Sequence, residues 1–125
     1  MTVDAAEVVV LRPEPGAPLR ARRFVQAALL DRVRPDVCDT AVLLASELVT
    51  NAVLHGRSPL SVEVSAGPGV VRVAVGDENS RLPVARPGVP GALDGRGLLI
   101  VGALASAWGV EVRPLGKAVW FELPA

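Results

Sequence analysis

Residues Ser46 to Gly56 read S-E-L-V-T-N-A-V-L-H-G and place an acid, Glu47, four positions before a carboxamide, Asn51. In a helix, side chains at this spacing lie one above the other on the same face. A carboxylate can polarise a nucleophile or a water, and a carboxamide oxygen is a hard ligand suited to Mg²⁺. Such a pair is more often a solvated helix edge, so the glycine-rich segments downstream must decide whether it belongs to a nucleotide site.

The helix that carries this pair is predicted to begin at Pro35-Asp36, where a proline and an acid favour a first turn, and to end at the cap Gly56. Apolar residues recur at helical intervals and are expected to pack inward, namely Ala41, Leu44, Ala45, Leu48 and Ala52. A second stripe is where the chemistry would take place, and it holds Thr40, Glu47, Asn51 and His55. A lone histidine is more often structural, so His55 is expected to cap or pack.

The other segments alternate between strand and helix patterns. A β-branched run in Glu7 to Arg12 predicts a strand, and an apolar stripe from Pro18 to about Arg32 predicts a helix. Beyond the long helix, the patterns predict a hairpin of Leu60–Ala66 and Val70–Val75, a loop over Glu78–Asp94, an apolar helix after Gly97, and strands at Gly109–Arg113 and Ala118–Leu123. This order predicts an α+β fold, a two-layer sandwich with about three helices on one face of a mixed, mainly antiparallel sheet of about five strands.

Composition favours a small cytoplasmic protein. The chain has 125 residues, of which 50% are apolar, so residues 1–125 fit a single domain with one core. The formal net charge is zero and no basic stripe occurs, which argues against nucleic-acid binding. The single cysteine, Cys38, favours a buried thiol in a reducing compartment. The N-terminus lacks the pattern of a secretory signal, and no window reaches the roughly 18 apolar residues expected of a membrane span.

Three further positions have both a chemical and a structural interpretation. Gly95-Arg96-Gly97 offers backbone amides at a helix start, which suits phosphate, although a helix start can also need glycine only to turn. Asp77, at a strand end, can accept a hydrogen bond from an amine such as that of adenine, or can form a turn. Lys117, after a turn, can meet a phosphate or decorate a hairpin. Neither a Rossmann fingerprint nor a P-loop is present.

The order of these segments resembles a known superfamily. E-L-V-T-N-A-V-L-H-G resembles the N-box, V-G-D-E-N-S-R-L-P the G1 region and D-G-R-G-L-L-I-V the G2 region of the GHKL, or Bergerat-fold, ATPases and kinases. The closing W-G-V and G-K-A-V-W-F-E-L segments and the short length are most similar to stand-alone anti-sigma-factor serine/threonine kinases of bacteria. The resemblance extends from about Pro18 to Leu123.

The resemblance implies a role for each matching residue. Glu47 would be the general base or water-orienting carboxylate, Asn51 would bind the Mg²⁺ that bridges the ATP phosphates, and Asp77 would take the adenine amine. The phosphates would lie at the helix start, flanked by Gly95 and Gly97 with backbone contributions from Arg96 and Leu98, and Lys117 would approach the phosphate end.

The resemblance also implies a regulatory function. A kinase of this type binds a sigma factor, phosphorylates an anti-anti-sigma antagonist on Ser or Thr, and forms a homodimer. A histidine kinase needs a phosphoacceptor helical hairpin and gyrase-like or MutL-like ATPases need a transducer domain, neither of which fits in 125 residues. Here Asp77 precedes E-N-S-R-L-P in place of the D-x-G-x-G glycines of many relatives. The loop over Glu78–Asp94 is the expected lid over the nucleotide, and its prolines would restrict its closure. A non-catalytic ATP-binding regulator that sequesters a protein partner is therefore the alternative. A small α/β protein without a nucleotide site is a third possibility.

Overall fold

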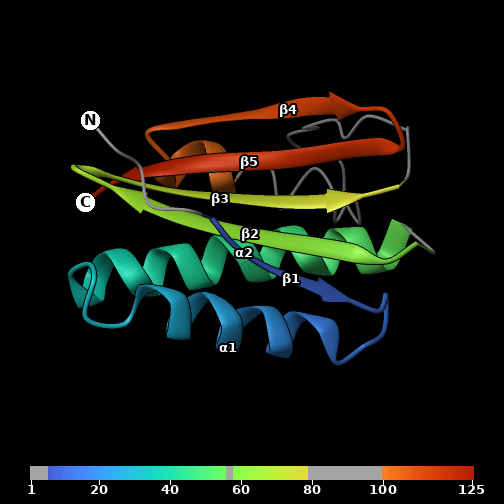
Figure 1. The fold of residues 1–125 in the computed structure, drawn as a ribbon, viewed down its shortest axis with the longest axis horizontal. Coiled ribbons are helices and arrows are strands. Elements are labelled where there is room, and N and C mark those ends of the chain that lie inside the picture. Colours follow the sequence, from blue (N-terminus) through green and yellow to red (C-terminus); the bar gives the residue numbers. More distant parts are fainter. Residues whose placement is uncertain (1–5, 56–57, 79–99) are drawn as a thin grey trace.

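The computed structural model describes residues 6–55, 58–78 and 100–125 of the chain (Figure 1). Its elements in chain order are β1 Glu7–Leu11, α1 Ala17–Leu29, α2 Pro35–His55, β2 Leu60–Gly67, β3 Val70–Asp77, β4 Ala107–Arg113 and β5 Gly116–Pro124. The five strands form one sheet in the order β1-β2-β3-β5-β4. All four strand pairings are antiparallel. The sheet of the described residues is therefore entirely antiparallel, whereas the sequence predicts a mixed, mainly antiparallel sheet.

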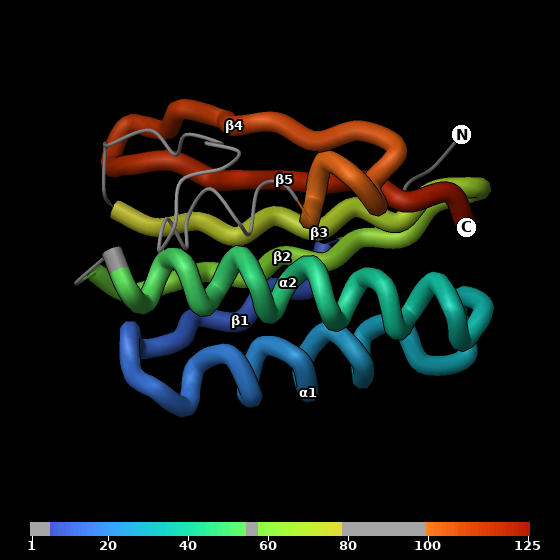
Figure 2. Tube along the Cα trace, turned by 180° about the vertical axis from the view of Figure 1, so that it is seen from behind, coloured from blue at the N-terminus to red at the C-terminus, as the bar shows by residue number. Residues whose placement is uncertain are grey.

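The helices form the second layer of an α+β sandwich, as predicted. In opposite views, α1 and α2 lie along one face of the sheet (Figures 1 and 2). Residues 100–104 are also helical, and Val101 among them is fully buried in the same core. The other face of the sheet carries ion pairs in place of a helical cover among the described residues, such as Arg72 with Glu122.

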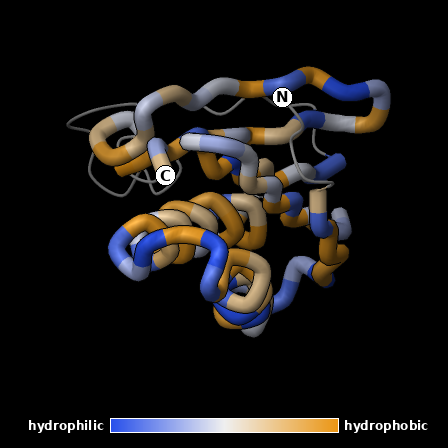
Figure 3. Tube along the Cα trace, turned by 60° about the vertical axis from the view of Figure 1, so that its left-hand side comes forward, coloured by the Kyte–Doolittle hydropathy of each residue, from blue (hydrophilic) through white to orange (hydrophobic). Residues whose placement is uncertain are grey.

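The core follows the alternation of the sequence. Every second residue of β2 is buried, whereas β3 also has a run of four buried residues from Val73 to Gly76. Hydrophobic positions recur along the helices and strands (Figure 3). From α2 the predicted core positions Ala41, Leu44, Ala45 and Leu48 are buried, and Ala52 packs against them half-buried. Full burial of one Leu or Val side chain stabilises a protein by about 1.5–3 kcal/mol, so this seam fixes α2 against the sheet.

Several element boundaries differ from the prediction, among them the end of α1 and the start of β5. Helix α1 ends at Leu29 and not at Arg32, because Leu30 leaves the helical region with ψ of 129° and Asp31 has a φ of 61°. Strand β5 begins at Gly116, two residues before the predicted start at Ala118. Lys117 is consequently a strand residue paired with Asp77 and not a turn residue.

Helix α2 has the length and composition of a membrane span, although the sequence predicts none. Residues 35–54 have a mean hydropathy of 1.5. The core helix of a soluble protein passes the same test, and α2 contacts α1 as well as β2, β3 and β5. These contacts bury one side of α2, including Leu44 and Val49, whereas Leu43 and Leu54 are exposed.

Cys38, in the first turns of α2, is buried as predicted. Burial raises the pKa of its thiol, and the neighbouring Asp39 carboxylate adds to the shift. Because the thiolate is the nucleophile, we expect iodoacetamide at pH 8 to label Cys38 at least about tenfold more slowly in the folded protein than in urea. Equal rates in the two states would contradict this, and Cys38→Ala is the blank.

The same shift makes stability depend on pH. The folded-state pKa of Cys38 lies above the unfolded value, so its stabilising contribution is complete below the unfolded pKa and is lost as pH rises through the folded pKa. We expect the free energy of unfolding to fall between pH 8 and 10 by more in the wild type than in Cys38→Ala.

Candidate functional site

Three elements that carry predicted site residues meet at one end of the part of the chain that the structure describes. The C-terminal end of α2, the end of β3 and the start of β5 lie together in both opposite views (Figures 1 and 2). Helix α2 contacts both strands, and β3 pairs with β5 along its whole length. The convergence is therefore a consequence of how α2 packs on the central strands.

Glu47 and Asn51 lie one helical turn apart in the C-terminal half of α2. Both are half-buried, whereas Leu48 and Val49 between them are buried in the core. A half-buried position at the border of a core leaves a polar side chain a route to a ligand. Their position four residues apart on one continuous helix is as predicted, and their roles stay predictions.

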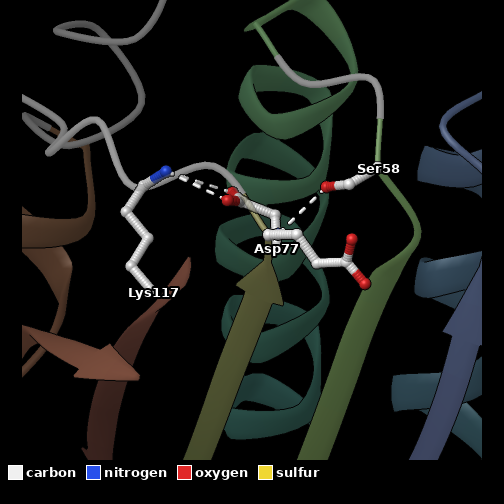
Figure 4. Close-up of polar contacts among 4 residues, drawn as sticks. Ser58, Asp77 and Lys117 are labelled. Atoms are coloured by element: carbon white, nitrogen blue, oxygen red, sulfur yellow. Dashed lines mark hydrogen bonds and ion pairs between the residues drawn. The ribbon is translucent and has the colours of Figure 1, made fainter. Parts of the chain in front are cut away.

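Asp77 and Lys117 form an ion pair that is largely buried at the end of the sheet (Figure 4). The ammonium Nζ of Lys117 donates to Oδ1 of Asp77 at 3.0 Å and to Oδ2 at 3.3 Å. The two side chains are only 9% and 10% exposed. Asp77 is therefore more than a turn former, and the structure places the Lys117 ammonium on this carboxylate, where the sequence predicts an approach to phosphate.

Two residues without a predicted role hold the end of β3 in place. Gly116 has a φ of 137°, and a Cβ there would lie 2.0 Å from the backbone oxygen of Asp77. Ser58 Oγ accepts a hydrogen bond from the backbone N–H of Glu78 at 3.0 Å. The sequence indicates a role for Gly116 only through its place in a proline-glycine turn. No local sequence pattern indicates a role for Ser58.

The predicted phosphate-binding turn lies outside the described residues, and this applies to Gly95, Arg96, Gly97 and Leu98. The predicted lid, apart from Glu78, also lies outside them. His55 is the last residue of α2, and its side chain is likewise not described. The assignments of these residues stay predictions.

The oxygen donors present fit Mg²⁺ better than a transition metal. In residues 6–55, 58–78 and 100–125, no group of three or more His, Cys, Asp or Glu could hold a metal ion by itself. Mg²⁺ is usually held by one or two protein oxygens, with substrate phosphates and water completing the octahedron. Asn51 would supply one such oxygen.

Comparison with known proteins shows the family to which this chain belongs. The family model of the histidine kinase-like ATPase domain matches residues 11–123. A similar protein is uncharacterized protein SCO4941 of Streptomyces coelicolor, with 39% identity over 82 residues, which cover 62% of this chain and 78% of that protein. This chain therefore belongs to the histidine kinase-like ATPase domain family, within the GHKL superfamily.

Proposed function

We propose that this protein is an ATP- and Mg²⁺-dependent serine/threonine kinase of the anti-sigma-factor type. Histidine kinase-like ATPase domains bind ATP with Mg²⁺ in general, which supports the cofactors. The observation that carries the proposal is the buried Asp77 carboxylate at the end of β3, a strand packed against α2, whose C-terminal half carries the half-buried Glu47 and Asn51. In this proposal Asp77 recognises the adenine end of the nucleotide, and Asn51 serves the phosphate end through Mg²⁺.

Each residue has a distinct task in this proposal. Asp77 accepts a hydrogen bond from the exocyclic amine of adenine, and Asn51 would hold the Mg²⁺, which would neutralise charge on the phosphates. Glu47 takes the proton of the acceptor hydroxyl while the hydroxyl oxygen forms a bond to the γ-phosphorus. The bond between the γ-phosphorus and the β–γ bridging oxygen breaks, and ADP leaves. Amides at Gly95 and Gly97 stabilise the negative charge that is transferred.

The proposed partners are a sigma factor, which the protein binds, and a small anti-anti-sigma antagonist, which it phosphorylates. A kinase that releases one partner when the other is phosphorylated regulates transcription without touching nucleic acid, which agrees with the zero formal net charge. The proposal includes a homodimer that acts in the cytoplasm, away from membranes.

A second candidate is a regulator that binds ATP without transferring phosphate and sequesters a protein partner. The absence of the G1 glycines after Asp77 favours it, because those glycines give relatives a mobile pocket edge. Mg·ATP binding without phosphorylation of any partner distinguishes this candidate from the kinase.

Nucleotide binding is tested with Asn51→Ala in the presence of Mg²⁺ and in EDTA. We expect wild-type affinity for ATP to be at least about tenfold higher with Mg²⁺, and Asn51→Ala to remove this difference, because a contact to a charged group contributes about 1.5–3 kcal/mol. Titration calorimetry measures all four dissociation constants.

The matched control is Thr50→Ala on the same helix, where the hydroxyl donates to the backbone oxygen of Ser46 at 2.8 Å. It should keep the Mg²⁺ dependence. Equal affinity of wild type and Asn51→Ala in both buffers would remove Asn51 from the metal site, and absence of ATP binding by the wild type would refute the proposed function.

A further inference from the structure

We infer that Lys117 is a positioning residue for purine recognition, acting through Asp77 and not on the phosphates. The inference rests on the proposed binding of ATP and deepens it. It assigns to the chain's only lysine the task of holding the Asp77 carboxylate oriented toward the exocyclic amine of the purine.

Strand register places the two side chains together. Asp77 and Lys117 are directly opposite each other in the antiparallel pairing of β3 with β5. Asp77 shares the parity of the buried Val73 and Val75, so both side chains project from the helix-covered face where the apolar core ends. The carboxylate therefore lies at the inner end of the sheet, beside the C-terminal end of α2.

Asp77 is restrained from several directions. The Lys117 ammonium contacts both carboxylate oxygens, at 3.0 Å and 3.3 Å, which opposes rotation of the group. The close approach at Gly116 fixes the backbone of Asp77 against β5, and Ser58 holds the next backbone N–H. A group that recognises a ligand by one hydrogen bond gains specificity from such pre-organisation.

The ammonium also fixes the direction in which the carboxylate presents its oxygens. A carboxylate accepts hydrogen bonds through about four lone-pair sites, which suits the N–H donors of an exocyclic amine. Burying a lone carboxylate is costly, and a paired cation offsets this cost. Lys117 contacts each of the two oxygens once, which occupies two of these roughly four lone-pair sites.

The same geometry argues against a phosphate contact. To reach a phosphate, the Lys117 ammonium would have to leave the carboxylate, and Asp77 would remain charged in a site that is about 90% shielded from solvent. Removing one partner of a buried pair is strongly unfavourable. The pair therefore stays together when nucleotide binds.

The experiment compares ATP with purine riboside triphosphate, which lacks only the 6-amino group. We expect wild type to prefer ATP by about tenfold or more, and Lys117→Met to reduce this preference to less than about threefold. The affinity of ATP relative to ADP and adenosine should stay unchanged, because no phosphate contact is lost. A merely structural role would weaken both triphosphates equally.

The control is Arg72→Met, which removes a cation of β3 on the opposite face of the sheet, where Arg72 lies over the Trp120 ring and beside Glu122. It should keep the preference for ATP. If Lys117→Met keeps the preference, or weakens ATP but not adenosine, the inference is overturned and Lys117 is a phosphate contact.

Lys117→Met leaves the Asp77 carboxylate without its cation and can unfold the protein. The same change is therefore also made in Asp77→Asn, in which residue 77 carries no charge. In Asp77→Asn, the further change Lys117→Met should alter affinity for ATP and for its deamino analogue less than twofold. A further loss confined to phosphate-bearing ligands would overturn the inference. A wild type that binds no ATP would instead refute the proposed function itself.

Discussion

Glu47→Gln should lower the rate of phosphoryl transfer to an antagonist protein by about 10²- to 10⁴-fold, the usual contribution of a positioned general base. Glutamine keeps the shape and polarity of the side chain on α2 but cannot take the proton of the acceptor hydroxyl. ATP affinity should change less than about threefold, because the proposed role of Glu47 is confined to the transfer step. Single-turnover assays with γ-labelled ATP and candidate antagonists from the same genome measure the rate, and calorimetry measures the affinity.

The matched control is Glu63→Gln on β2, an acid that pairs with Arg113 at 3.3 Å on the sheet. It should transfer phosphate at the wild-type rate. Undiminished transfer by Glu47→Gln would remove Glu47 from the mechanism. A wild type that binds Mg·ATP and transfers to no antagonist would favour the sequestering regulator over the kinase.

Gly116→Ala should lower the free energy of unfolding by about 3 kcal/mol or more. A φ of 137° is strained for a residue with a side chain and costs about 1–3 kcal/mol, and a Cβ 2.0 Å from the Asp77 backbone oxygen adds an overlap that only strand movement relieves. Urea denaturation gives the change.

Gly69→Ala is the control, because Gly69 has a φ of 77° and a Cβ at that position would have no neighbouring atom within 4 Å. It carries the backbone strain without the overlap and should cost about 1 kcal/mol. If Gly116→Ala costs no more than Gly69→Ala, the close approach of β5 to Asp77 does not hold the strand end.

The sequence alone determined the features that depend on neighbouring residues. A period of 3.6 identified α2 and its buried stripe, and a period of 2 identified the hairpin of β2 and β3, because these periods follow from the backbone geometry of one element. The relation of Glu47 to Asn51 is of the same kind, since one helical turn joins them. The order of the motifs along the chain likewise indicated the superfamily.

Only the tertiary structure decided what lies opposite what. Asp77 and Lys117 are 40 residues apart and meet because β3 and β5 pair in one register, with β5 beginning at Gly116. A pattern within each strand says which side chains share a face, but the turn and the packing of the whole sheet set the register between strands. Local patterning therefore specified the helix that carries the proposed metal ligand, whereas the buried ion pair at the proposed purine anchor depends on long-range strand pairing.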